Sequence, residues 1–132
     1  MSAAGSVLLD TSVVVDYLRG DQNLGRRFAG FAATYVPLIV VGELYYGAHR
    51  APRGEEAFAK VRDFLRTSVL LLPDESTADQ YGRVKAELAR IGRPIPENDV
   101  WIAAMALQYD LPIVTRDAHF SLVSRLKIVA VE

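Results

Sequence analysis

The 132-residue chain is 51 % apolar, which suits a single domain with one hydrophobic core over residues 1–132. Its formal net charge of −1 excludes attraction of nucleic acid by a global positive field, and the lack of cysteine excludes disulfides, thiolate catalysis and cysteine metal sites. Because no apolar run approaches the roughly 18 residues that span a bilayer, and no basic region precedes an apolar one at the N-terminus, we expect a cytoplasmic protein without a membrane partner.

The first predicted strand, residues 6–9, is a short run of Val and Leu that fits a strand buried on both faces. Asp10 stands where this strand ends. Thr11 and Ser12 follow, and either side chain can cap the helix that the apolar positions up to Leu18 indicate. A carboxylate is thus placed at the C-terminal edge of an interior strand, where ligands gather in open α/β sheets.

Helical spacing and short apolar runs alternate through the rest of the chain. Helices are predicted over residues 23–33, 39–50, 57–67, 76–91 and 97–107, with a helical turn at 120–124. Further strands are predicted over residues 34–36, 69–72, 113–115 and 127–131. Ser76 with Asp79 resembles a capping box, and Asn98 can cap its helix. This alternation predicts an α/β fold, a three-layer α/β/α sandwich with a parallel sheet.

Four acids from distant segments are predicted to meet. Asp10 and Asp117 each follow a strand directly, Asp99 opens a helix, and Glu43 lies in the first turns of another. Right-handed crossovers return every strand in the same direction, so helices that follow strands also begin near the carboxyl edge of the sheet. One pocket could therefore collect all four carboxylates.

Such a cluster needs compensation for its negative charge. Two unit charges about 5 Å apart repel by roughly 3 kcal/mol at an effective dielectric near 20, so the pKa values of the acids would rise. A bound divalent cation removes this repulsion, and ligands limited to oxygen favour Mg²⁺ or Mn²⁺. Such an ion can polarise a phosphoryl oxygen, lower the pKa of its bound water and orient the scissile bond.

The segments that carry these acids resemble those of PIN-domain ribonucleases, specifically VapC-type toxins of bacterial toxin–antitoxin pairs. The matching segments occur in the order of the family and are residues 9–12 (LDTS), 42–47 (GELYYG), 98–104 (NDVWIAA) and 115–120 (TRDAHF). One departure is the start of the helix that carries Glu43. Relatives often have Ser or Thr there, whereas residues 37–41 are PLIVV, so no side-chain cap is expected.

The resemblance implies a site and a set of partners. The implied metal site consists of Asp10, Glu43, Asp99 and Asp117. Ser12 would supply a hydroxyl near Asp10 or a water on the metal, and Thr115 would supply another near Asp117. The family cleaves RNA phosphodiesters by metal-activated water, so Mg²⁺ or Mn²⁺ is the implied cofactor. A cognate VapB-like antitoxin, with its tail across the acidic groove, and a homodimer are also implied.

Other interpretations stay open on the residues alone. His49 and His119 allow a metal-free acid–base ribonuclease, although His49 suits a helix end and His119 a loop. A non-catalytic or DNA-directed PIN-domain protein that binds nucleic acid or a partner is a second alternative. A phosphoacceptor receiver domain needs a carboxylate pair at its first strand and a Lys ending its last strand, whereas Asp10 stands alone and Lys127 begins a strand. A phosphatase of the haloacid type needs an acid where Ser12 stands.

Overall fold

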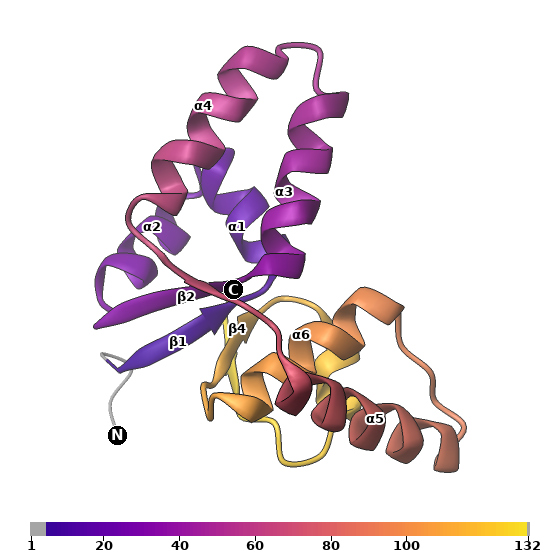
Figure 1. Ribbon diagram of the computed structural model, residues 1–132. Helices are drawn as coiled ribbons and strands as arrows, with labels where there is room; N and C mark the ends of the chain where they lie inside the picture. The colour runs from indigo at the N-terminus through magenta and orange to yellow at the C-terminus, as the bar shows by residue number, and fades with distance from the viewer. Residues whose placement is uncertain (1–4, 132) are drawn as a thin grey trace.

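The computed structural model describes residues 5–131, in which five strands form one sheet in the order β3-β2-β1-β4-β5 (Figure 1). Every neighbouring pair is parallel. The strands are β1 (Ser6–Leu9), β2 (Ala33–Pro37), β3 (Val69–Leu71), β4 (Ile113–Thr115) and β5 (Ile128–Ala130). The central strand β1 is buried on both faces, because it pairs with β2 on one side and β4 on the other and is covered by helices. The predicted parallel α/β fold is confirmed.

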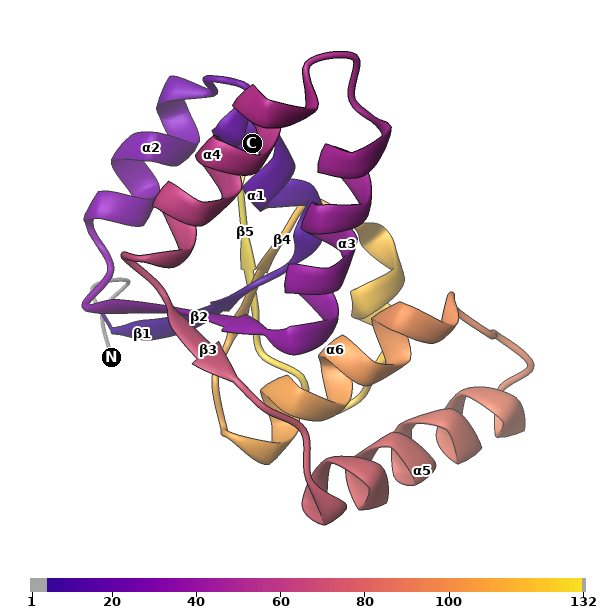
Figure 2. The ribbon, with the colours of Figure 1, turned by 45° about the horizontal axis from the view of Figure 1, so that its top comes forward.

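The helices cover both faces of this sheet. They are α1 (Thr11–Leu18), α2 (Gln22–Ala29), α3 (Leu38–Arg50), α4 (Gly54–Leu65), α5 (Glu75–Arg90) and α6 (Glu97–Gln108), with the 3₁₀ helix η1 (Ala118–Leu122) before β5. The chain steps from β1 to β2 to β3 in one direction and then crosses back to β4. Right-handed crossovers therefore place α1 to α4 on one face and α5 and α6 on the other, as Figures 1 and 2 show.

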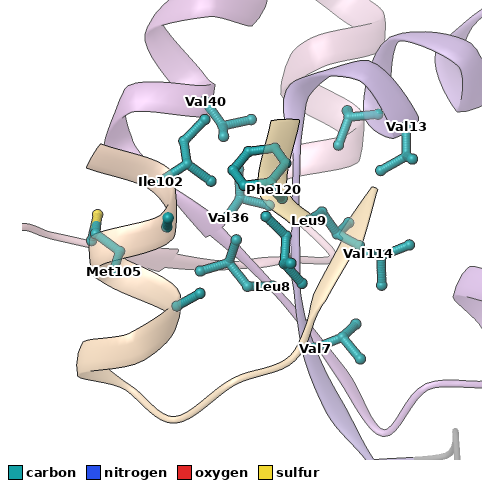
Figure 3. Packing of buried hydrophobic residues seen from close by; sticks show 14 of the residues in the cluster. Val7, Leu8, Leu9, Val13, Val36, Val40, Ile102, Met105, Val114 and Phe120 are labelled. Atoms are coloured by element: carbon teal, nitrogen blue, oxygen red, sulfur yellow. The ribbon is translucent and has the colours of Figure 1, made fainter. Parts of the chain in front are cut away.

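The core fixes the two segments that approach the carboxyl edge of the sheet. Ile102 and Met105 of α6, Leu8 of β1 and Phe120 of η1 are fully buried and belong to one hydrophobic cluster (Figure 3). Small buried residues of α6, such as Ala103, allow the helix to approach the strands closely. The residues at the start of α6 and around η1 are thus held by packing. Within residues 5–131, no helix combines the length and apolar character that crossing a bilayer requires.

The end of α2 and the start of α3 are set by their surroundings as well as by local sequence. α2 ends earlier than predicted, at Ala29, where Gly30 forms the cap. Ala33 instead pairs with Ser6 and belongs to β2, so strand pairing overrides the helical pattern. α3 begins after Pro37 without a side-chain cap, as expected from the residues at that position.

The cap of α5 differs from the prediction. Asp74, not Ser76, caps the helix, and it forms a capping box with Thr77 rather than with Asp79. The Asp74 carboxylate accepts hydrogen bonds from the Thr77 N–H at 3.2 Å and from Nε2 of Gln108 at 2.7 Å. Thr77 is fully buried and also donates to the Gln108 side chain. The cap therefore ties the start of α5 to the end of α6.

Replacing Asp74 by Ala removes the cap and the bond to Gln108. We expect Asp74→Ala to lower the free energy of unfolding by about 1–2 kcal/mol, measured by urea denaturation. Glu75→Ala, at the exposed neighbouring position, is the matched control and should cost less than about 0.5 kcal/mol. Equal losses in the two variants would contradict the role of the Asp74 cap.

Candidate metal centre

The candidate site lies where the chain path across the sheet reverses. Asp10 directly follows β1 and Asp117 lies just beyond β4, and these two strands are neighbours. The Asp10 N–H donates to the Val114 carbonyl at 3.2 Å, so the two strand ends are joined by their backbones. From β1 the chain continues to one side of the sheet, and from β4 it continues to the other. This is the topological switch point at which α/β sheets bind ligands.

Asp10 is the innermost carboxylate of the site, with 3 % of its surface exposed. It is itself the cap of α1, a role predicted for Thr11 or Ser12: its Oδ1 accepts from the Thr11 N–H at 2.7 Å. Its Oδ2 accepts from the Ser12 hydroxyl at 2.9 Å and the Thr115 hydroxyl at 2.8 Å. Burial raises the pKa of Asp10, and the charge of Asp117 adds to this, while the three donors act in the opposite direction.

Asp99, Asp117 and His119 form a group of side chains that could hold a metal ion. One ligand atom from each lies within 4.8 Å of the others. The His119 Nδ1 is 3.3 Å from Asp99 Oδ2 and 3.0 Å from Asp117 Oδ1. Burial raises the pKa of Asp99 to about 6, and the charges of Asp10 and Asp117 contribute to the rise. The acids therefore repel one another at this edge of the sheet, and a divalent cation held by them would relieve that repulsion.

Glu43 lies beside this group without joining it directly. Its Oε1 accepts a hydrogen bond from the Thr11 hydroxyl, and its Oε2 accepts one from Nδ2 of Asn98 at 3.2 Å. Thr11 follows Asp10 and Asn98 precedes Asp99, so Glu43 is linked to both acids through their chain neighbours. The prediction that Asn98 caps α6 is wrong, because the helix begins at Glu97 and its cap position is Pro96, whose side chain has no acceptor. Asn98 lies inside the first turn, and its side chain donates to Glu43 of α3.

The segment between Thr115 and Asp117 is fixed from both sides. The Thr115 hydroxyl, which donates to Asp10, accepts a hydrogen bond from the Asp117 N–H at 2.9 Å. Arg116 pairs with Asp16 of α1 at 2.7 Å and with Asp21, the cap of α2, at 3.0 Å. The predicted site residues thus lie at one edge of the sheet, and their assignment as ligands or catalytic groups stays a prediction.

The two histidines have different surroundings. The ring of His49 packs edge-on against Phe58, with 4.6 Å between centroids, which is a contact between α3 and α4. His119 instead contacts two acids of the site. The sequence predicts a loop at His119 and no part for it in the metal site, whereas the residue lies in η1. Its position two residues after Asp117 is the one signal in the sequence for its place at the site. The ion pairs of Arg116 with Asp16 and Asp21 are also not predicted from the sequence, because no local pattern indicates these two acids as its partners.

The model of the PIN domain family matches residues 7–126. This chain belongs to the PIN domain family. PIN nucleases use a divalent metal ion, and Asp99, Asp117 and His119 of this PIN domain form a group that could hold one.

Relatives of this PIN domain cover most of its length. Ribonuclease VapC2 from Haemophilus influenzae is 35 % identical over 112 residues, which are 83 % of this chain and 85 % of that protein. A tRNA(fMet)-specific endonuclease VapC from Shigella flexneri is 35 % identical over 114 residues, 85 % of this chain and 86 % of that one. The structure of DNA-bound VapBC from Salmonella typhimurium superposes with a TM-score of 0.90 at 27 % identity, covering 95 % and 97 % of the two chains. The predicted membership among VapC-type PIN domains is confirmed.

The raised pKa of Asp99 predicts how the stability of the metal-free protein varies with pH. The folded-state pKa of about 6 lies above the ordinary value of 3.8, so stability is lost as pH rises from about 4 through 6. The Asp99 side chain is only 13 % exposed. In EDTA at pH 7.5, Asp99→Asn should therefore raise the free energy of unfolding by about 1–3 kcal/mol, and at pH 4 by less than about 1 kcal/mol.

Urea denaturation at the two pH values tests this expectation. Asp79→Asn is the control, because Asp79 forms only an exposed pair with Arg83 and should change stability by less than about 0.5 kcal/mol at either pH. If Asp99→Asn destabilised the metal-free protein at pH 7.5, the charge of Asp99 would not be unfavourable in the folded state.

Proposed function

We propose that this PIN domain, a single unit over residues 1–132, is a Mg²⁺- or Mn²⁺-dependent endoribonuclease toxin that hydrolyses RNA phosphodiester bonds and is neutralised by a cognate VapB-like antitoxin. The observation that carries the proposal is the convergence of Asp10, Asp99 and Asp117 at the switch point of the sheet. It occurs in a chain whose 35 % identical relatives are named ribonucleases and endonucleases.

In this proposal the metal is held by Asp10, Glu43, Asp99 and Asp117, and Ser12 and Thr115 act on Asp10. The two hydroxyls and the Thr11 N–H hold both oxygens of Asp10 in one orientation, so its carboxylate is arranged before the ion arrives. Asp99, with a pKa of about 6, is ionised at neutral pH and available as a ligand. Glu43 is held by one donor on each oxygen, the Thr11 hydroxyl and Nδ2 of Asn98, and these donors belong to the chain neighbours of Asp10 and Asp99.

The donor atoms support the choice of ion. Carboxylate oxygens predominate among the proposed ligands, and hard oxygen ligands suit Mg²⁺ and Mn²⁺. When bound, such an ion polarises the phosphoryl oxygen and lowers the pKa of the attacking water. The chain itself supplies the fixed carboxylates around the ion, and these are positioned by β1, α3, α6 and the turn after β4.

Purified protein should cut RNA with Mg²⁺ or Mn²⁺ and stop in EDTA. We expect Asp10→Asn and Asp99→Asn each to slow cleavage by at least about 100-fold, because each removes a charge that holds the ion. Cleavage is followed on total tRNA and on messenger RNA, with single-stranded DNA as a test of the DNA-directed alternative. Mapping the cleaved ends identifies the target.

Asp79→Asn, on the exposed surface of α5, is the control and should cleave RNA within about twofold of the natural protein. Circular dichroism establishes that the variants are folded. Full activity of a folded Asp10→Asn variant, or cleavage that persists in EDTA, would reject the proposed mechanism. Metal binding without cleavage of any RNA would favour the non-catalytic alternative.

A second feature supports the antitoxin part of the proposal. A hollow of about 480 Å³ lies between α1, α3 and α4. Apolar side chains line much of it, including Val15, Leu18 and Leu44. The charged residues of the lining are three basic ones and one acid: Arg19, Arg53, Lys60 and Glu56. An apolar segment of a protein partner flanked by acidic residues suits this lining. We infer that the antitoxin places such a segment here.

Filling the hollow should separate antitoxin binding from RNA cleavage. A side chain at Gly47, which lines the hollow, would start in open space, since nothing lies within 4 Å of the added Cβ. We expect Gly47→Trp to weaken binding of the cognate antitoxin by about tenfold or more through steric blocking. Cleavage of RNA should persist. Binding is measured by calorimetry with purified components.

Gly82→Trp is the matched control. Gly82 is a helical glycine of α5 with equally open space around an added Cβ, and it lies outside the residues that line the hollow. It should bind the antitoxin as the natural protein does. Undiminished binding by Gly47→Trp would show that the antitoxin sits elsewhere.

A further inference from the structure

His119 places an imidazole nitrogen among the carboxylates of the site. Its Nδ1 lies 3.3 Å from Asp99 Oδ2 and 3.0 Å from Asp117 Oδ1. Adjacent ligands of an octahedral ion with bonds of about 2.1 Å are separated by about 3 Å. The distance from Nδ1 to each carboxylate oxygen is therefore close to the distance between two adjacent ligands of one ion.

The backbone around His119 holds the ring in this place. The His119 N–H donates to Asp117 Oδ1 at 2.9 Å, which caps η1 and fixes the start of the turn. The next residue, Phe120, is fully buried in the core. The ring therefore projects from a short segment that is anchored at the Asp117 cap and at the Phe120 side chain.

The His119 side chain is 48 % exposed, whereas the Asp99 side chain is 13 % exposed. Without an ion, Nδ1 lies at hydrogen-bond distance from Asp99 Oδ2. An ion between these atoms would replace that contact, because the imidazole can instead carry its proton on Nε2 and present a lone pair on Nδ1. A neutral imidazole in that tautomer is a metal ligand.

We propose that His119 Nδ1 is a direct ligand of the ion held by Asp99 and Asp117, and that it gives this site a preference for Mn²⁺ over Mg²⁺. This inference rests on the proposed function, because it concerns the same ion. Imidazole suits transition metals, whereas Mg²⁺ prefers oxygen ligands and water. A site with carboxylates alone would lack this source of discrimination.

Metal binding by the full chain tests the inference without RNA. Mn²⁺ is titrated into metal-free protein and followed by electron paramagnetic resonance, and Mg²⁺ is measured by competition. We expect electron spin echo modulation of bound Mn²⁺ to show coupling to a directly bound ¹⁴N nucleus. His119→Gln should abolish that coupling and raise the Kd for Mn²⁺ by about 10- to 100-fold, while the Kd for Mg²⁺ changes by less than about threefold.

His49→Gln is the matched control, because His49 packs against Phe58; it should keep both the nitrogen coupling and the Mn²⁺ affinity. Bound Mn²⁺ without nitrogen coupling, or unchanged Mn²⁺ affinity in His119→Gln, would overturn the inference. In either case, loss of Mn²⁺ binding in Asp99→Asn would still support the proposed metal-dependent nuclease, with oxygen ligands alone at the ion. Failure of the natural protein to bind Mn²⁺ would overturn both.

Discussion

The burial of the Asp10 carboxylate is the constraint on which the rest of the site depends. A charged group with 3 % exposure must be supplied with donors, and these come from Thr11, Ser12 and Thr115. The same carboxylate ends β1, begins α1 and binds the end of β4. One side chain therefore couples the centre of the sheet, the first helix and the C-terminal part of the chain.

The carboxylates of Asp10, Asp99 and Asp117 repel one another, and this repulsion lowers the stability of the folded protein. The charge of Asp117 contributes to the raised pKa of Asp10 and of Asp99, and burial is the larger cause in both. The apolar packing of α6 and of Phe120 stabilises the arrangement against this repulsion. Unfavourable charge placed on well-packed elements is typical of functional sites, where the unfavourable energy is released on ligand binding.

Much of this arrangement could be predicted from the sequence, because it depends on rules of chain direction. Strand ends in a parallel sheet meet at one edge, and that rule alone places Asp10 and Asp117 together. What could not be predicted depends on tertiary contacts. Asn98 has the local properties of a cap, but the approach of α3 gives it Glu43 as a partner. The direction of the His119 ring follows from the Asp117 cap and the burial of Phe120, which no local pattern encodes.

The order of the segments along the chain has a consequence for biosynthesis. Thr115 and Asp10, which share a hydrogen bond, are separated by 105 positions. A nascent polypeptide that has not yet reached residue 115 therefore contains Asp10 without Thr115 and Asp117. Until β4 (Ile113–Thr115) and the turn after it have been synthesised, the Asp10 carboxylate lacks one of its three donors and the edge of the sheet lacks one of its acids.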